Sequence, residues 1–219
     1  MLEINKQALD AFDVMAAGGV DGPIRAAEPF VFGYTDPLGA QNMIDESRKL
    51  IALGQRVEAQ ILPADRAREL SPMLSKAIRS AVTLGGQRFL DPPAFIAALA
   101  GSVVARGGDL RTGTKVIAAS DLGVRVRVQG TEIDESFDAV VLATGVTLPE
   151  LAAPFGVRIP MQAGRGYSFS AAVKEMPEAP IYFPDASVVC TPIGGRIRIA
   201  GMMEFRPHGA PIDPRRIAA

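Results

Sequence analysis

The stretch Asp138-Ala-Val-Val-Leu-Ala-Thr-Gly145 decides the fold that the sequence predicts. Its interior is entirely apolar, and it ends at a threonine and a glycine. A short apolar run of this kind is typical of a strand that is buried on both faces of a parallel sheet. We therefore expect a buried strand over Asp138–Ala143. Gly145 then lies at its carboxyl end, where open α/β sheets bind ligands and where a missing Cβ lets a ligand approach the backbone. A plain strand end without a ligand is the alternative.

The residues before this stretch predict a helix followed by a hairpin. Asp91-Pro92-Pro93 is a strong helix start, because a carboxylate can cap the helix and proline loses no hydrogen bond in the first turn. Gly107-Gly108 ends the helix. Strands are expected over Thr114–Ala119 and Val124–Val128, the second with alternating valine and arginine.

The flanking regions predict further helices and strands, so the fold class is mixed α/β. The first third predicts helices over Ile4–Ala17, Ala40–Leu53 and Asp65–Leu70, and strands over Pro29–Tyr34 and Val57–Leu62. The last third predicts strands over Gly166–Ser170, Ile181–Phe183, Ser187–Thr191 and Arg196–Ala200. Arg196 and Arg198 alternate with isoleucines, which favours a solvent-exposed face for the two arginines.

Composition excludes several classes of protein. The 219 residues carry 23 Lys and Arg against 24 Asp and Glu, so a nucleic-acid partner held by phosphate contacts is not expected. One cysteine (Cys190) and one histidine (His208) exclude an internal disulfide and argue against a metal site. The start shows no signal-peptide pattern, and the longest uncharged run, Pro92–Ala105, is too short to span a bilayer. The default expectation is a cytoplasmic protein.

No single catalytic motif assigns a reaction. The sequence contains no G-x-G-x-x-G, P-loop, G-x-S-x-G or H-E-x-x-H pattern. Gly164-Arg165-Gly166 is followed by Tyr167 rather than by a dinucleotide-binding continuation.

The pieces taken together resemble a known family. The order and spacing of Asp138–Gly145, Leu151–Gly156, Gly164–Tyr167 and Arg196–Phe205 are similar to those of the D-amino-acid dehydrogenases, within the FAD-dependent D-amino acid and glycine oxidase superfamily. The resemblance covers almost every residue, and it corresponds to the central part of family members. It implies part of an FAD-binding dinucleotide domain over residues 87–150 and a mainly antiparallel-sheet substrate domain built from residues 1–86 and 151–219.

The resemblance also implies site residues. Val116 corresponds to a backbone contact to the adenine, and Ala143, Thr144 and Gly145 to the segment beside the dinucleotide. Gly166 and Tyr167 correspond to the stretch near the flavin ring and the substrate. We expect Arg165 to bind the substrate carboxylate, because a glycine on each side of it in the chain lets the loop bring its guanidinium close to a bound carboxylate. For Tyr182, a core position and a pocket position stay equally open. The catalytic residues stay unassigned, and no metal is expected.

The activity implied by the resemblance is FAD-dependent oxidative deamination of a D-amino acid to a 2-oxo acid, with hydride transfer to the flavin, as part of amino-acid catabolism. Electrons then pass to a respiratory acceptor, which implies contact with the inner membrane face. Two alternatives stay open: a non-catalytic remnant or isolated structural domain, and a glycine- or sarcosine-type amine oxidase. Because the G-x-G-x-x-G turn is missing, we expect this chain alone to bind FAD weakly or not at all and not to turn over. We also expect it to dimerise or to aggregate through an exposed Ala139–Ala143 strand.

Overall fold

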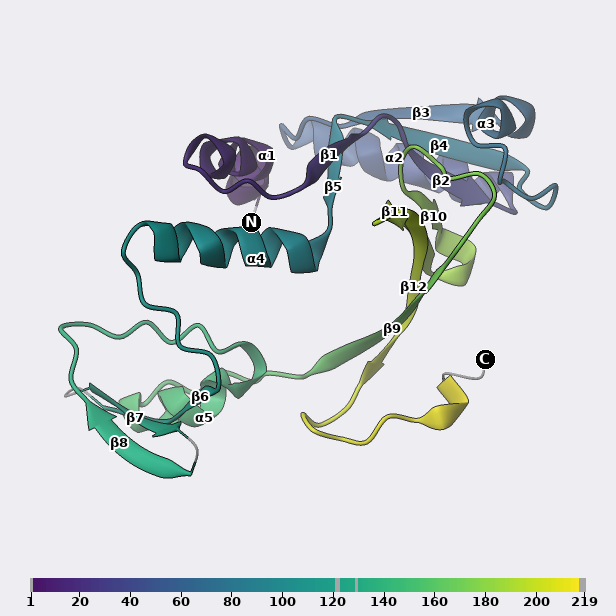
Figure 1. The fold of residues 1–219 in the computed structure, drawn as a ribbon. Helices are drawn as coiled ribbons and strands as arrows, with labels where there is room; N and C mark the ends of the chain where they lie inside the picture. The colour runs from purple at the N-terminus through teal and green to yellow at the C-terminus, as the bar shows by residue number, and fades with distance from the viewer. Residues whose placement is uncertain (1, 121–122, 129, 217–219) are drawn as a thin grey trace. The chain divides into compact units, whose positions relative to one another are not determined.

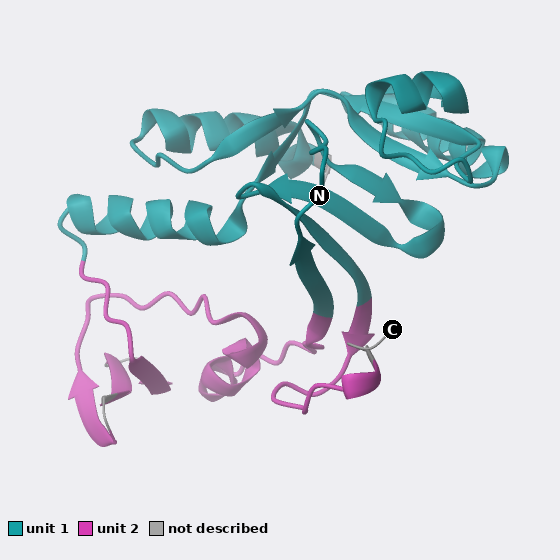
Figure 2. Cartoon of the chain, turned by 45° about the vertical axis from the view of Figure 1, so that its right-hand side comes forward, with its two compact units in different colours: residues 1–108, 166–202 teal, residues 109–165, 203–219 magenta. Residues whose placement is uncertain are grey.

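The computed structural model describes residues 2–120, 123–128 and 130–216. The chain divides into two compact units. Unit 1 comprises Met1–Gly108 and Gly166–Met202, and unit 2 comprises Asp109–Arg165 and Met203–Ala219 (Figure 2). The sequence interpretation placed its boundaries near residues 86 and 150, and its assignment of a substrate domain and an FAD-binding fragment stays a prediction.

A seven-stranded sheet is the main element of unit 1, to which all of its residues belong except 164–165 at the start of β9 and 203–205 at the end of β12 (Figure 1). Its strand order is β3-β4-β2-β10-β11-β12-β9. The strands are β2 (Phe30–Tyr34), β3 (Glu58–Pro63), β4 (Ser80–Gly85), β9 (Gly164–Ala171), β10 (Ile181–Phe183), β11 (Val188–Ile193) and β12 (Arg196–Phe205). The pairs β3–β4, β2–β4, β10–β11 and β11–β12 are antiparallel, and β10 pairs with β2 in parallel. The predicted mainly antiparallel sheet is confirmed.

Two helices pack against the sheet, one beside each of its two hydrophobic clusters. Helix α2 (Pro37–Ala52) begins at its N-cap Asp36, whose carboxylate accepts a hydrogen bond from the Leu38 amide at 3.0 Å. Its Ala40 is fully buried with Tyr34 and Val82. Helix α3 (Ala64–Leu70) contributes Ala67 to a second cluster that includes Val31 and Ile181. On β2, Phe32 and Tyr34 belong to the cluster beside α2, and Val31 belongs to the cluster beside α3. Because successive residues of a strand point to opposite faces, the two clusters lie on opposite faces of the sheet.

Unit 1 also contains a helical pair. Helices α1 (Leu2–Ala17) and α4 (Pro92–Ala105) lie side by side, where the rings of Phe12 and Phe95 meet edge to face at 5.5 Å (Figure 1). The predicted cap is confirmed, since the Asp91 carboxylate accepts from the Ala94 amide at 3.4 Å. A two-stranded sheet of β1 (Ile24–Ala27) and β5 (Gln87–Leu90) completes the unit.

Unit 2 is built on a small antiparallel sheet with the order β6-β7-β8. The strands are β6 (Thr114–Ser120), β7 (Gly123–Val128) and β8 (Thr131–Glu135), and the short helix α5 (Leu148–Ala152) packs against β6. Its buried hydrophobic residues are Ala119, Val126, Leu151 and Ala152. Short 3-10 turns occur at η1 (Gly145–Thr147) and η2 (Ala153–Phe155), and elsewhere in the chain at η3 (Pro184–Ala186) and η4 (Pro214–Arg216).

The predicted strand over Asp138–Ala143 is wrong. These residues form a segment without helix or strand, and the Val141 side chain is 88% exposed. A doubly buried strand exists only where neighbouring strands accept its backbone hydrogen bonds. Among the described residues, β6, β7 and β8 pair with one another and not with this segment. The apolar run alone therefore does not make a strand.

Candidate functional site

The four predicted cofactor-binding residues lie in unit 2. Val116 is half-buried in β6, where it pairs with Val126 of β7. The register of this pair shifts between Val116 and Ala118, which marks a β-bulge at Ile117. A bulge interrupts the ladder and leaves backbone groups without a strand partner. The backbone beside Val116 is therefore able to hydrogen-bond a ligand.

Ala143, Thr144 and Gly145 form an exposed run that ends in η1. The Thr144 carbonyl accepts hydrogen bonds from the Thr147 amide at 3.3 Å and from the Thr147 hydroxyl at 3.0 Å. Gly145 has a φ of +56°, and a Cβ built on it meets no atom within 4 Å. The structure thus brings these three predicted residues together in one stretch whose backbone is open to approach.

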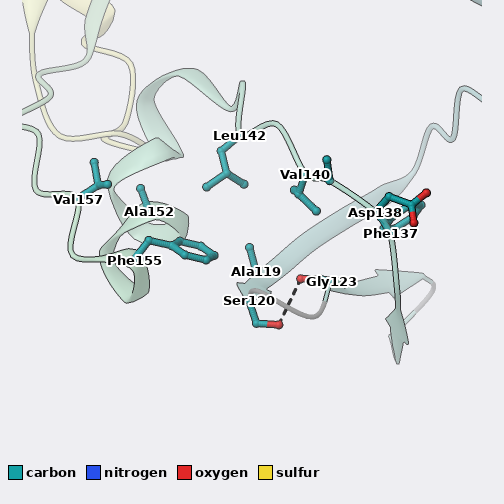
Figure 3. A pocket seen from close by; sticks show the side chains of 11 residues that line it. Ala119, Ser120, Gly123, Phe137, Asp138, Val140, Leu142, Ala152, Phe155 and Val157 are labelled. Atoms are coloured by element: carbon teal, nitrogen blue, oxygen red, sulfur yellow. Dashed lines mark hydrogen bonds between the residues drawn. The ribbon is translucent and has the colours of Figure 1, made fainter.

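A pocket of about 350 Å³ lies next to this stretch within unit 2 (Figure 3). It is lined by Ala119, Ser120, Gly123, Phe137, Asp138, Ala139, Val140, Leu142, Ala152, Phe155 and Val157. Figure 3 shows the side chains of Leu142, Phe155 and Ala119 directed into the same space. The Ser120 hydroxyl donates to the Gly123 carbonyl at 3.4 Å. A predominantly apolar lining with few polar groups is typical of small-molecule pockets.

Three of the predicted substrate-binding residues lie in unit 1. Gly166 and Tyr167 follow one another in β9, and the Tyr167 side chain is half-buried. Tyr182 in β10 is paired with Phe32 of β2, and the two rings meet edge to face at 5.5 Å. Phe32 in turn packs against the cluster beneath α2. Tyr182 therefore lies at the margin of the core, half-buried, on the α2 face of the sheet.

Arg165, the predicted carboxylate ligand, belongs to unit 2 and has several partners there. Its guanidinium forms an ion pair with Glu204 at 3.5 Å and donates to the Ala210 carbonyl at 2.6 Å and to the Pro211 carbonyl at 3.3 Å. Arg206 also donates to the Pro211 carbonyl, at 3.2 Å. Arg165 therefore holds the segment after β12, and its role toward a substrate stays a prediction.

Three groups near the end of β2 and in β11 have shifted pKa values. Burial, followed by the charges of Asp185 and Tyr182, raises the pKa of the Tyr34 phenol. Hydrogen bonds from the side chain and the backbone of Thr35 hold the pKa of the Asp185 carboxyl below its usual value. Cys190 is half-buried in β11, and burial raises the pKa of its thiol, which favours the protonated form.

Sequence reasoning missed the polar residues that share a sheet face with Tyr182. Arg198, interpreted from its alternation as solvent-exposed, is half-buried in β12 opposite Thr191 of β11. Its guanidinium donates to the Ser168 hydroxyl at 3.2 Å. The register between neighbouring strands shows that these residues share a face. The alternation within a single strand does not reveal that register, so the sequence could not predict it.

The described ranges contain neither a cluster of metal ligands nor a helix that could span a membrane. There, no three His, Cys, Asp or Glu side chains gather closely enough to hold a metal ion. In the same ranges, no helix has both the length and the apolar character that a membrane span needs.

Comparison with known proteins places the chain among flavoenzymes. Residues 1–219 match the family described as "DAO: FAD dependent oxidoreductase". A D-amino acid dehydrogenase from Cereibacter sphaeroides is 32% identical over 167 residues, which cover 73% of this chain and 38% of the relative. A D-amino acid dehydrogenase from Dechloromonas aromatica is 30% identical over 200 residues, which cover 85% of this chain and 47% of the relative. The chain thus spans less than half the length of these curated relatives.

Solved structures share the fold. The glycine oxidase from Bacillus cereus superposes with a TM-score of 0.77 at 21% identity, over 99% of this chain and 60% of that chain. The L-proline dehydrogenase from P. horikoshii superposes with a TM-score of 0.72 at 15% identity, over 99% of this chain and 59% of that chain. The family match over the whole chain, the two dehydrogenase relatives and the shared fold agree. The chain therefore belongs to the DAO family of FAD-dependent oxidoreductases.

Proposed function

We propose that the protein acts in the oxidation of the Cα–N bond of a D-amino acid, with FAD as the electron acceptor. The observation that carries this proposal is the similarity to D-amino acid dehydrogenases, which extends over 85% of the chain and so includes both units. In this reaction the amino acid loses a hydride from Cα and a proton from nitrogen. The resulting imine is then hydrolysed to a 2-oxo acid and ammonia.

The residues of unit 2 fit a dinucleotide cofactor. The bulge next to Val116 leaves backbone groups for the adenine, and the open backbone of Thr144 and Gly145 permits close approach of the ribityl or phosphate part. The apolar pocket beside Leu142 and Phe155 suits a flat ring or an apolar segment. When bound, FAD supplies a two-electron acceptor.

The residues of unit 1 bind and orient the substrate in this proposal. The Tyr182 ring packs edge to face against Phe32, which fixes its orientation on one face of the sheet, where it can contact the substrate. Gly166 in β9 leaves room beside the strand, because the nearest atom to a built Cβ is a carbonyl oxygen at 3.9 Å. Tyr167 follows it as a second half-buried aromatic group. With a single histidine in the sequence, we expect the substrate amine to bind already deprotonated rather than to lose its proton to a histidine.

Flavin reduction tests this function. The protein is purified together with any flanking sequence that completes the FAD-binding domain and is loaded with FAD. The visible absorption bands of the oxidised flavin are then followed without oxygen after addition of D-alanine, L-alanine, glycine or sarcosine. Bleaching by the D-enantiomer but not by the L-enantiomer is the expected result. Bleaching by glycine or sarcosine, with hydrogen peroxide formed in proportion when oxygen is admitted, supports a glycine- or sarcosine-type oxidase. An FAD-loaded protein that none of the four compounds reduces supports a non-catalytic domain and contradicts the proposal.

A further inference from the structure

A small cavity of about 80 Å³ lies in unit 1, where three segments of the chain meet. The turn between β1 and β2 contributes Glu28, the end of α3 contributes Ser71, and the segment before β10 contributes Glu178. The parallel pairing of β2 with β10, in which Val31 lies opposite Ile181, joins the first and third segments. The cavity shares no residue with the pocket of unit 2 or with the predicted substrate-binding residues.

The Ser71 side chain has an unused hydrogen-bonding group at this cavity. Its backbone groups are both engaged, because the amide donates to the Ala67 carbonyl at 2.9 Å and the carbonyl accepts from the Leu74 amide at 3.0 Å. The residue is only 5% exposed, and its hydroxyl has no hydrogen-bond partner among the described residues. A buried hydroxyl without a partner is destabilising, so this position favours a ligand that can hydrogen-bond to it.

The other polar side chains that line the cavity belong to two glutamates. Glu28 accepts a hydrogen bond from the Gly86 amide at 3.1 Å, whereas Glu178 accepts none in the described part of the chain. Within the same residues, neither carboxylate has a lysine or arginine partner. Pro29 and Pro177 also line the cavity, and proline has no amide hydrogen to donate. The lining is therefore rich in acceptors and negative charge, which favours a positively charged donor.

The size of the cavity and its acceptors indicate which kind of cation fits. A volume of about 80 Å³ holds a few water molecules or one small ion. A metal site is not indicated, since no three His, Cys, Asp or Glu side chains gather anywhere in the described ranges. A primary ammonium group carries its charge on three N–H donors, which match the three acceptors Glu28, Glu178 and Ser71.

We propose that this cavity binds an ammonium group, as a free ammonium ion or as the end of a small primary amine, through Glu28, Glu178 and the Ser71 hydroxyl. The proposal is independent of the proposed function, which uses none of these three residues. Hydrogen bonds from an ammonium group to carboxylates are charge-assisted and therefore stronger than bonds between neutral groups. The Ser71 hydroxyl gains the partner that it lacks in the protein. Because the ligand binds the folded unit, it stabilises that unit against unfolding.

Thermal unfolding of the full chain tests the proposal. The melting temperature is measured by circular dichroism in the chloride salts of sodium, potassium, tetramethylammonium, ammonium and methylammonium at equal ionic strength. Ammonium is expected to raise the melting temperature in a concentration-dependent way. Potassium and tetramethylammonium carry the same charge without N–H donors, so they are expected to match sodium. An equal response to methylammonium assigns the end of a primary amine as the ligand, and a response to ammonium alone assigns the free ion.

Substitutions locate the response, with binding measured by calorimetry. Glu178→Gln is expected to weaken ammonium binding by about 10- to 150-fold, because a charge-assisted contact is lost. Ser71→Ala is expected to be at least as stable as the wild type without ammonium, since it removes an unpartnered buried hydroxyl, and yet to bind ammonium more weakly. Glu175→Gln is the matched control, because Glu175 is exposed and does not line the cavity. It removes the same charge and is expected to bind as the wild type.

Three results overturn the proposal. A wild type that does not respond to ammonium shows that the cavity holds water alone. Potassium raising the melting temperature as much as ammonium shows a general effect of cations. Equal ammonium affinities of Glu178→Gln and Glu175→Gln place any binding elsewhere. Far-ultraviolet circular dichroism checks that each variant folds, and Glu28→Gln replaces Glu178→Gln if the latter does not.

Discussion

Gly123 in unit 2 is a position where the structure predicts that adding a single methyl group is strongly destabilising. It begins β7 with a φ of +143°, and it lines the pocket beside the predicted cofactor segment. A Cβ added to it would lie 2.1 Å from the carbonyl oxygen of Glu135 and 3.0 Å from the Cα of Ser136. Both contacts are with backbone, so no side-chain rotation relieves them. Gly123→Ala must therefore separate the start of β7 from the end of β8.

The size of the effect follows from two contributions. An L-residue in the left-handed region costs about 1–2 kcal/mol, and overpacking against a fixed neighbour costs about 1–3 kcal/mol. Gly130→Ala is the matched control, because Gly130 lies between β7 and β8 with a φ of +88° and no atom within 4 Å of a built Cβ. Gly130→Ala therefore bears only the cost of the positive φ and not the cost of overpacking. We expect Gly123→Ala to destabilise unit 2 by about 2–5 kcal/mol and Gly130→Ala by about 1–2 kcal/mol.

Hydrogen exchange measured by mass spectrometry gives the local free energy of opening for peptides that cover β7 and β8. Urea unfolding followed by circular dichroism gives the global value for comparison. Peptides of the α2 region serve as an internal reference, since α2 belongs to unit 1. Equal losses in the two glycine variants would refute the reasoning, because they would mean that the close approach of Gly123 to Glu135 does not exist in solution.

Three further predictions concern the cofactor segment, the core and acid stability. A Cβ added at Gly145 or at Gly113 has no atom within 4 Å, so Gly145→Ala and Gly113→Ala are both expected to cost about 1–2 kcal/mol of local stability through their positive φ alone. Only Gly145→Ala is expected to weaken FAD binding in a fluorescence titration. Equal FAD affinities of the two variants would contradict the cofactor assignment. Val82→Ala removes two methyl groups from a fully buried position and is expected to lower the free energy of unfolding, measured by urea denaturation, by about 1.5–3 kcal/mol. A change below about 0.5 kcal/mol would count against the core described for unit 1. Because hydrogen bonds from Thr35 lower the pKa of the Asp185 carboxyl, its stabilising contribution is present above the usual aspartate pKa of 3.8 and is lost as the pH falls through the lower folded-state pKa. Asp185→Asn should therefore flatten the fall in melting temperature across that acidic range, and an unchanged acid profile would show that the contact contributes nothing.

Local sequence signals determined most of the helices and many of the strands. The Asp91-Pro92-Pro93 signal produced α4 with the expected cap, and the apolar spacing of the first residues produced α1. The alternation of valine and arginine marked β7. These elements are specified by near neighbours in the chain, through capping groups and side-chain periodicity, so a single sequence contains enough information to place them. The family, and with it the kind of cofactor, followed from the order of several such pieces.

Only the tertiary structure decided which segments have partners. The apolar run of Ala139–Ala143 reads as a strand, yet it stays unpaired because no described neighbour accepts its hydrogen bonds. Arg165 and Arg198 look alike in sequence, each beside small or apolar residues. The fold gives Arg165 an acidic partner and two carbonyls, and gives Arg198 a hydroxyl on a half-buried sheet face. Strand pairing and charge compensation depend on residues distant in the chain, which is why local patterns do not specify them.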